Sequence, residues 1–415
     1  MNEIVLVNVT GPDRPGITAA LTEVMGKYGI IVLDIGQAVI HHNLSWGMLV
    51  EVPAEAAVSP VFKELMFKAH ELGLLMQLTP VSEGNYTDWV KKQGQARYVI
   101  TVLAKALEAE ALSRVSELIA VNHLNIDQIR RMSGRESLSV PLHRRRSAIE
   151  FHVRGPVPDH TVMHATFLQL SQRLNIDIAI QEDNVFRRNR RLVCFDMDST
   201  LIQNEVIDEL AKVAGVGPEV SAITERAMSG EIEFRDSFKQ RLALLEGLPE
   251  SKLAGIAEAL TITDGAQTLI NTLKYHKFKV AILSGGFTYF AKFLQKKLAI
   301  DYVYANELEI VDGKLTGQVI GDIVDESRKA ELLRQIANDE DIHLEQVIAV
   351  GDGANDVPML CIAGLGIAFR AKPIVKQQTR FALGSASLDS ILFLIGMRER
   401  DFRTISSLPN SIYPQ

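Results

Sequence analysis

The stretch from Leu192 to Thr200 constrains the fold of this chain more than any other, because an apolar strand there runs directly into two acidic residues. Asp196 and Asp198 follow this strand and are separated by one residue. Open α/β sheets bind ligands outside the carboxyl ends of their strands, and a buried carboxylate pair draws a cation or a shared proton. Two interpretations stay open at this point: a metal site, or an acidic cap at the N-terminus of a helix.

Length and composition place the chain among multidomain globular proteins. Its 415 residues exceed one ordinary hydrophobic core, which favours two or three domains, and 47% hydrophobic with 23% charged residues is typical of soluble proteins. A net charge of −7 gives no reason to expect a nucleic-acid partner. No apolar run is long enough to span a membrane and no signal peptide is apparent, so we expect a cytoplasmic protein with no membrane partner. Cys194 and Cys361 lie in apolar sequence and are predicted to be buried free thiols.

Residues 1–84 have the pattern of a small α+β module with the element order βαββαβ. A β-rich run ends in the turn-rich segment Gly11–Gly16, and apolar residues at helical spacing begin at Ile17. The expected elements are strands at 4–9, 30–40, 46–52 and 74–78 and helices at 17–28 and 62–72.

The same order returns from about Arg97 to Glu182, so the N-terminal region contains an internal repeat. The segment between the copies, Tyr86–Gln95, is polar and lacks periodicity, and we interpret it as a linker. The expected elements of the second copy are strands at 98–103, 125–132, 149–153 and 176–180 and helices at 109–119 and 160–174.

This twofold pattern, with Gly-Pro-Asp-Arg-Pro-Gly after the first strand, resembles the ACT family of small regulatory domains. The resemblance implies ACT-like α+β domains at 1–84 and 97–184. It also implies an edge that binds an amino-acid effector such as serine, although a purely dimerising module is an equally open interpretation. In both cases the expected assembly is a homodimer. The second copy has Ala104–Glu108 at this position and lacks the Gly-Pro signature. The candidate effector residues are Asp13, Arg14, Pro15 and Gly16.

Two short basic runs flank the second half of this repeat. Arg144–Arg146 lies in an apparent insertion between strands, and Arg187–Arg191 precedes the central strand. Short basic runs in an acidic protein are usually solvated, so we predict that both are exposed loop or linker faces. The second marks a domain boundary near residue 186.

The C-terminal half alternates strands with helices, which predicts a doubly wound parallel sheet. A helical block at about 204–262 follows the first strand directly, and such an insertion predicts a cap over the strand ends. Further strands are expected at 279–283, 300–304 and 346–350. Polar residues follow three strand ends, and a helix before the last adds a lysine. They are Asp196 and Asp198, then Ser284 and Gly285, then Lys329, and finally Asp352, Asn355 and Asp356.

This ordered set resembles the haloacid dehalogenase-like phosphohydrolase superfamily over residues 190–415. The segment from Met228 to Arg241, together with Glu205, is similar to the members whose substrate is O-phosphoserine. The resemblance implies a Mg²⁺-dependent phosphoric monoester hydrolase that releases serine and phosphate through an aspartyl-phosphate, in the final step of serine biosynthesis.

The resemblance also implies the catalytic and metal-binding roles. Asp196 is the expected nucleophile, and Asp198 is the expected acid for the leaving oxygen and then the base for water. The expected Mg²⁺ ligands are the side chains of Asp196 and Asp352 and the backbone carbonyl of Asp198. Asp356 is expected to support this metal shell.

The expected substrate-binding residues divide into those for phosphate, for the charged amino-acid groups and for the short side chain. Read without the resemblance, Arg241 is a surface residue paired with Asp236 or Glu246, and Glu205 is a charge at a helix N-terminus. The expected set is Ser284, Gly285, Lys329 and Asn355 for phosphate, Glu205 and Arg241 for the ammonium and carboxylate, and Met228 and Phe234 as cover.

Two other functions stay open. One is a phosphatase or phosphotransferase that acts on another small phosphometabolite. The other is an amino-acid-sensing binding protein whose C-terminal domain is inactive.

Overall fold

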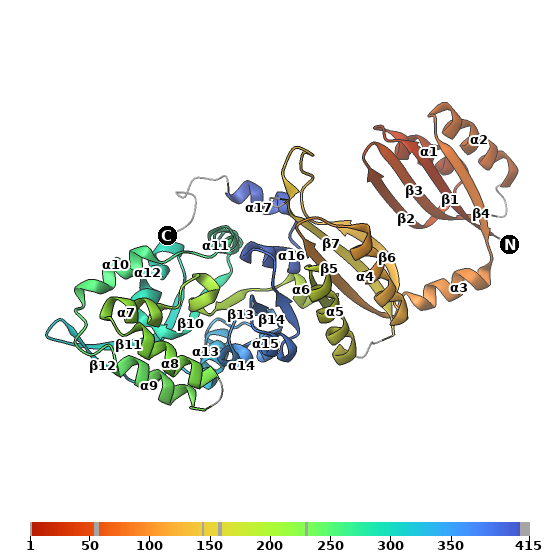
Figure 1. Cartoon of the computed structure of the whole chain (residues 1–415). Helices are drawn as coiled ribbons and strands as arrows, with labels where there is room; N and C mark the ends of the chain where they lie inside the picture. Colours follow the sequence, from red (N-terminus) through yellow and green to blue (C-terminus); the bar gives the residue numbers. More distant parts are fainter. Residues whose placement is uncertain (1, 54–57, 143–144, 157–159, 229–230, 407–415) are drawn as a thin grey trace. The chain divides into compact units, whose positions relative to one another are not determined.

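The computed structural model describes residues 2–53, 58–142, 145–156, 160–228 and 231–406. The chain divides into two compact units, residues 1–95 and 96–415 (Figure 1). The second copy of the repeat therefore belongs to the same unit as the C-terminal domain. This grouping does not follow from the repeat itself, and its cause lies in how the second sheet is buried.

The first copy is a four-stranded antiparallel sheet in the order β2-β3-β1-β4. Its first strand alternates buried and half-buried residues, so Val5, Val7 and Val9 pack against two helices while the other face is only partly covered. The elements are β1 (Glu3–Pro12), α1 (Ile17–Lys27), β2 (Ile31–Ile40), β3 (Asn43–Val52), α2 (Val58–Glu71) and β4 (Leu75–Val81).

The segment that we interpreted as a linker is largely helical. Helix α3 (Glu83–Lys92) begins where the Ser82 side chain accepts a hydrogen bond from the Asn85 N–H at 3.2 Å. Asp88 and Lys91 pair at 3.5 Å on its surface, and the helix buries no residue. Because capping and surface charges form this helix, it has no apolar stripe that a periodicity search could detect.

The second copy repeats the topology in the order β6-β7-β5-β8, but its sheet is buried on both faces. Ile100, Val102 and Phe151 pack against the helices of the copy, while Leu103 and Ala148 join the core of the C-terminal domain. The elements are β5 (Ala96–Ala104), α4 (Ala109–Val121), β6 (Asn125–Arg131), β7 (Ser147–Gly155), α5 (His160–Leu174) and β8 (Asp177–Glu182).

The C-terminal domain is a seven-stranded sheet in the order β12-β11-β10-β9-β13-β14-β15, parallel except at the β11–β12 pair. The predicted α/β fold class with two preceding α+β modules is confirmed. The strands are β9 (Leu192–Phe195), β10 (Lys279–Phe287), β11 (Tyr302–Val311), β12 (Lys314–Ile320), β13 (Val347–Gly351), β14 (Leu365–Phe369) and β15 (Phe381–Leu383).

Helices cover both faces of this sheet. Residues of α11, α12 and α16 share one core with the second copy, and α13 and α14 pack on the opposite face. The helices are α6 (Val185–Arg188), α11 (Ala266–Tyr275), α12 (Thr288–Leu298), α13 (Glu326–Asp339), α14 (Val357–Ile362), α15 (Pro373–Gln378), α16 (Ile391–Leu394) and α17 (Glu399–Ser406).

The predicted cap is present as a helical block between β9 and β10. Figure 1 shows α7, α8 and α9 gathered on one side of the sheet. The helices are α7 (Val206–Ala214), α8 (Gly217–Met228), α9 (Phe234–Ala243) and α10 (Ser251–Ala259). No helix within the described ranges has both the length and the apolar character that a membrane crossing requires.

The prediction that both basic runs are solvated is wrong for three arginines. Arg146 lies 2.6 Å from Asp389 and 3.1 Å from Glu399, and it also stacks over Phe393. Buried acids of the C-terminal domain and of β7 need a positive partner, and arginines of the two runs supply it. The acids lie far away in the chain, so a local run of basic residues cannot reveal these pairs. Arg144 lies outside the described residues. The other two buried arginines are Arg187, which pairs with Glu150, and Arg190, which donates to the carbonyls of Glu345 and Gly364.

The two cysteines differ from each other. Cys194 is buried on β9, as predicted, whereas Cys361 is exposed near the end of α14. Cys361 lies in an apolar run, but one side of α14 faces solvent and the thiol is on that side. The prediction of a buried thiol is therefore wrong for Cys361.

Candidate active site

The site begins where β9 ends and the chain turns sharply. The Asp196 N–H donates to the Val350 carbonyl of β13 at 2.9 Å, which fixes the carboxyl end of β9 beside that of β13. The following turn, Met197–Leu201, includes Ser199 at φ 54°, a conformation that non-glycine residues rarely adopt. The helix-cap interpretation concerns Asp198, Ser199 and Thr200. Asp198 does accept a backbone hydrogen bond at the start of α7, but it also lines one cavity together with Asp196, so a cap alone does not account for the pair.

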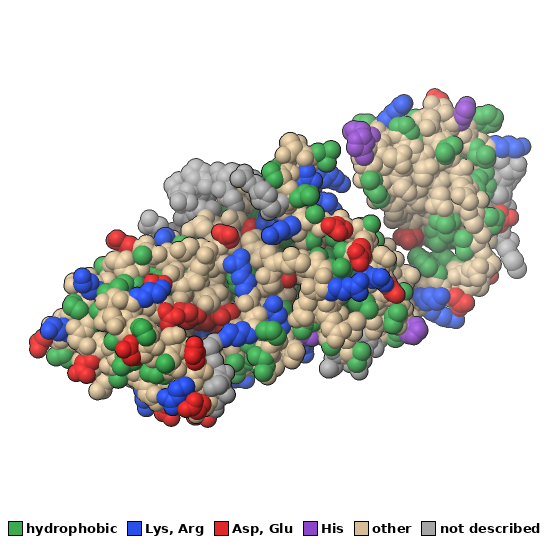
Figure 2. All heavy atoms as spheres, in the orientation of Figure 1, with side chains coloured by type: hydrophobic (Ala, Val, Ile, Leu, Met, Phe, Trp, Pro, Cys, Tyr) green, Lys and Arg blue, Asp and Glu red, His purple; other side chains and the backbone are tan. Residues whose placement is uncertain are grey.

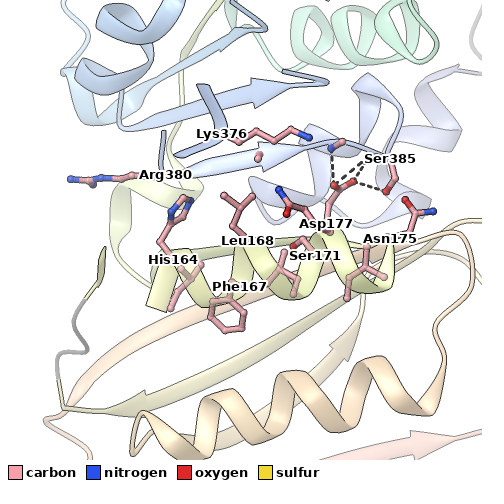
Figure 3. Close-up of a pocket in the computed structure, with 15 residues that line it drawn as sticks. His164, Phe167, Leu168, Ser171, Asn175, Asp177, Lys376, Arg380 and Ser385 are labelled. Carbon is pink, nitrogen blue, oxygen red and sulfur yellow. Dashed lines mark hydrogen bonds between the residues drawn. The ribbon is translucent and has the colours of Figure 1, made fainter. Parts of the chain in front are cut away.

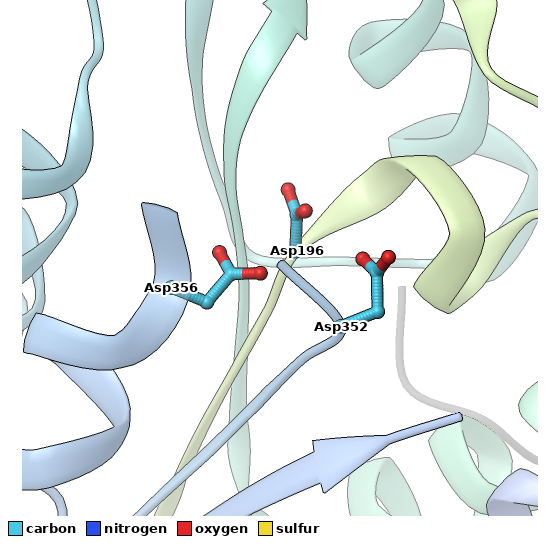
Figure 4. Close-up of side chains that lie close together, drawn as sticks. All are labelled: Asp196, Asp352 and Asp356. Atoms are coloured by element: carbon cyan, nitrogen blue, oxygen red, sulfur yellow. The ribbon is translucent and has the colours of Figure 1, made fainter. Parts of the chain in front are cut away.

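Three carboxylates from two strand ends meet at this edge of the sheet. Asp196, Asp352 and Asp356 each place an oxygen within 4.8 Å of the others (Figure 4). Lys329, fully buried on α13, lies 2.9 Å from Asp196 and 2.7 Å from Asp356. All four residues were predicted as site residues from the sequence, and the fold places them in one cluster.

The electrostatics of the cluster call for more positive charge than Lys329 supplies. Burial and the neighbouring Asp356 raise the pKa of Asp196 to about 7, although Lys329 opposes the shift. Burial, then Asp196 and Asp356, raise the pKa of Asp352 to about 8. A cation would stabilise the charged forms of Asp196 and Asp352 against both burial and their mutual repulsion. Carboxylate oxygens are the donors that hard divalent cations such as Mg²⁺ prefer, so the residues fit such an ion.

Asp198 has a different environment from Asp196. Its Oδ1 accepts a hydrogen bond from the Val206 N–H at 3.1 Å, at the start of α7. Burial, followed by the charges of Glu205 and Asp196, raises the pKa of Asp198 well above its ordinary value. The side chain is therefore suited to carry a proton at neutral pH.

The carboxyl end of β10 approaches Asp196 and Asp198 closely. The Ser284 hydroxyl is buried and accepts a hydrogen bond from the Gly286 N–H at 2.9 Å. A Cβ on Gly286 would lie 2.6 Å from Asp198 Oδ2, so only glycine fits there. Asn306 donates to the Gly285 carbonyl at 2.8 Å and holds this strand end. Sequence reasoning missed Asn306.

Glu205 and Arg241 face the same cavity from the cap. The Ser199 hydroxyl donates to Glu205 at 2.6 Å, while burial raises the pKa of Glu205 against that hydrogen bond. Burial lowers the pKa of Arg241, and the charges of Glu205 and Asp208 oppose this shift. In the described part of the chain Arg241 forms no ion pair within 4 Å, so the expected surface pairs with Asp236 or Glu246 are not observed.

The cavity has a volume of about 650 Å³ and is lined by residues of the cap, β9, β10 and the loop after β13. Ser284, Lys329 and Asp356 lie behind this lining and are buried. The side chains of Met228 and Phe234 lie outside the described residues. Lining residues that sequence reasoning missed include Ser199, Asp208, Phe238, Glu326, Lys372 and Ile374.

The predicted effector loop belongs to the first unit. Its residues are exposed, and the Asp13 N–H donates to the His42 carbonyl at 2.8 Å. Gly16 has φ 92° and begins α1, a position that favours glycine. A ligand at this loop stays a prediction.

Family models match three consecutive parts of the chain. An ACT domain matches residues 3–79, a second ACT domain matches 96–181, and a haloacid dehalogenase-like hydrolase matches 193–360. These matches follow the order of the three folded parts.

Similar proteins of known name cover nearly the whole chain. Phosphoserine phosphatase SerB2 of Mycobacterium tuberculosis is 39% identical over 95% of this chain and 93% of its own length. Phosphoserine phosphatase of Streptomyces coelicolor is 37% identical over 98% and 95%. Among solved structures, a probable phosphoserine phosphatase of Vibrio cholerae superposes with a TM-score of 0.57 at 33% identity, covering 76% of this chain and 89% of that one.

Proposed function

This chain belongs to the phosphoserine phosphatase family, and from that premise we propose how it hydrolyses O-phosphoserine to serine and phosphate in the final step of serine biosynthesis. The observation that carries the proposal is a single cavity that joins the Asp196 cluster to Glu205 and to Arg241, which forms no ion pair with any described residue. The first group can perform phosphoryl transfer, and the second can recognise an amino acid.

We propose a covalent route through Asp196. One oxygen of Asp196 attacks phosphorus, the bond between phosphorus and the serine oxygen breaks, and Asp198 donates its proton to that oxygen. Water then attacks the aspartyl-phosphate while Asp198 takes up the water proton, so phosphate leaves and both carboxyl groups return to their initial states. The raised pKa of Asp198 supports its role in the first step, and activity should fall as the pH rises through that pKa.

We propose Mg²⁺ as the cofactor, held by the side chains of Asp196 and Asp352 and by the backbone carbonyl of Asp198. When bound, the ion supplies charge that reduces repulsion between the carboxylates and the phosphate. Both oxygens of Asp356 are already engaged, one by Lys329 at 2.7 Å and one by the Gly353 N–H at 3.0 Å. This arrangement supports a positioning role for Asp356 rather than direct ligation.

We propose that the phosphoryl oxygens are held by residues of the strand ends, which concentrates donors where charge develops. Glu205 would bind the substrate ammonium, and Arg241 would bind the carboxylate through two parallel hydrogen bonds. Met228 and Phe234 stay predictions for the cover over the short side chain. The proposed phosphate-binding groups are Ser284, the Gly285 N–H, Lys329 and Asn355.

A substrate comparison tests the recognition of the amino acid. O-phosphoethanolamine lacks only the carboxylate of phosphoserine, so Arg241→Met should lower kcat/KM for phosphoserine by about 100-fold and leave that for phosphoethanolamine nearly unchanged. The exposed Lys239→Met, on the same helix, is the matched control and should change neither value. Equal wild-type rates on phosphoserine, phosphothreonine and sugar phosphates would contradict the proposed substrate.

The remaining predictions from sequence concern regulation and assembly. We propose that serine or another amino acid binds near Asp13–Gly16, and that the chain is a cytoplasmic homodimer. Calorimetry with serine and a Gly16→Val variant tests the effector site, and unchanged serine binding would count against it.

A further inference from the structure

A second cavity lies within the 96–415 unit, between the second ACT domain and the phosphatase domain (Figure 3). Helix α5 and strand β8 form one wall, and the segment from α15 through β15 forms the other. Its volume is about 190 Å³, and none of its lining residues lines the active-site cavity. We call this space the seam cavity. The proposed catalytic mechanism uses none of its residues.

The acidic residue of the seam cavity is fully occupied by the protein. Asp177 accepts hydrogen bonds from the N–H groups of Gly384 at 2.7 Å, Ser385 at 3.1 Å and Ala386 at 2.9 Å, and from the Ser385 hydroxyl at 2.9 Å. Asp177 therefore anchors one domain to the other. Its lone pairs are not available to a ligand cation.

The basic residues of the seam cavity differ from Asp177 in their contacts. Lys376 is half-buried and Arg380 lies at the rim, and neither forms an ion pair within 4 Å in the described part of the chain. Figure 3 shows the Lys376 side chain extended along the cavity, whereas the Arg380 guanidinium points outward. His164 lies between the two walls and hydrogen-bonds to the Arg380 backbone. Lys376 and Arg380 together outweigh the single negative charge of Asp177, so the lining carries a net positive charge.

The rest of the wall is short and mixed, because the polar residues Ser171, Gln172 and Asn175 line it together with apolar ones. Its apolar part is Phe167, Leu168 and Ile178, and the volume equals roughly six water molecules at about 30 Å³ each. A bare oxyanion would leave this apolar surface uncovered, and a ligand larger than a few carbon atoms would not fit. A carboxylate on a short carbon skeleton satisfies both the lysine and the apolar wall.

We propose that the seam cavity binds a small organic carboxylate that carries no ammonium group. The carboxylate pairs with Lys376, and the carbon skeleton packs on Leu168. An amino acid is disfavoured because no carboxylate is free to receive its ammonium, in contrast to the active site, where Glu205 faces the cavity. The seam cavity thus differs in ligand class from both the catalytic site and the effector loop predicted in the first ACT domain.

Helix α15 lines both the seam cavity and the active-site cavity, so a ligand bound in the first can affect the second. Val375 lines the active-site cavity and Lys376, the next residue, lines the seam cavity. A ligand that fixes Lys376 therefore acts on the same short helix as the active-site wall, so we expect it to change the KM for phosphoserine. By reciprocity, a bound substrate analogue should change the affinity of the seam ligand by the same factor.

The binding test uses the full-length chain with ¹³C-labelled histidine and observes the His164 resonance by NMR, assigned with His164→Gln. Glycerate and L-serine are matched probes, because glycerate is serine with a hydroxyl in place of the ammonium. We expect glycerate, at up to about 10 mM, to shift the His164 resonance saturably, with at least about tenfold higher affinity than serine. The resonance reports the seam cavity even when a probe also enters the active site.

Variants locate the carboxylate. Lys376→Gln should weaken glycerate binding at least about tenfold, while the exposed Lys296→Gln, which removes the same charge elsewhere, should not. Thermal melting confirms that each variant is folded. No saturable shift with glycerate would overturn the site. Serine binding as tightly as glycerate, or a shift with inorganic phosphate alone, would overturn the ligand class, and an unchanged KM at saturating glycerate would overturn the coupling.

Discussion

The two ACT domains share one topology but differ in what their sheets contact. Strand β1 of the first domain alternates buried and half-buried residues, whereas the equivalent β5 of the second is buried almost throughout. The second sheet sends Leu103, Ala148 and Ala179 into the core of the phosphatase domain. The same βαββαβ fold thus serves once as a separate unit and once as part of the catalytic unit.

The open sheet of the first ACT domain keeps apolar residues on its surface. Ile31, Ile35 and Ile40 of β2 are 52%, 52% and 77% exposed, and Figure 2 shows hydrophobic side chains spread over the surface of this unit. In the second domain the corresponding face carries Glu150, which is buried and paired with Arg187. The two copies share a topology, so it is the burial of the second sheet that makes that copy part of the unit containing the active site.

Introducing the same charge into both sheets should give the largest contrast. Ala148 and Ser45 occupy equivalent places, opposite Leu103 on β5 and Thr10 on β1. Ala148→Arg places a charge in a closed core and should lower the free energy of unfolding by about 5 kcal/mol or more. Ser45→Arg lies on the open face and should change it by less than about 0.5 kcal/mol. Denaturant unfolding followed by circular dichroism measures both, and similar losses in the two variants would refute the distinction.

Breaking the buried ion pair should have the next largest effect. Arg187→Met leaves Glu150 buried without its partner and should cost about 3–5 kcal/mol of unfolding free energy. Lys27→Met in the first domain removes an exposed pair with Glu64, 2.9 Å apart, and should leave the unfolding midpoint unchanged. If Lys27→Met destabilises as much as Arg187→Met, the pair in the second domain has no special role.

Acid should weaken the second domain by a smaller amount. Burial opposes ionisation of Glu150, but His152 and Arg187 outweigh it and hold the pKa of Glu150 below its ordinary value. A depressed folded-state pKa gives stability that is present above the unfolded pKa of about 4.3 and is lost as the pH falls through the folded one. Glu150→Gln should therefore flatten the stability curve below about pH 4.3, measured by melting temperature, and the exposed Glu3→Gln should not. If the melting temperatures of Glu150→Gln and the wild type fall in parallel below about pH 4.3, Glu150 is not the source of the acid sensitivity.

Local sequence signals predicted most of the fold and brought together the residues of the acidic cluster. Apolar strands followed by Asp196 and Asp352 were sufficient, because carboxyl ends of neighbouring parallel strands meet at one edge of a sheet. Features that depend on partners distant in the chain could not be predicted from the sequence. The burial of Arg187 follows from Glu150, and the need for glycine at Gly286 follows from the approach of Asp198.

The central claim, that Asp196 carries the phosphoryl group, has one direct test. The wild type, mixed with ³²P-labelled phosphoserine and quenched in acid within milliseconds, should yield labelled protein whose label maps to Asp196. Asp196→Asn should show neither label nor turnover and should keep the wild-type circular dichroism spectrum. Labelled protein or phosphate release by folded Asp196→Asn would contradict the account.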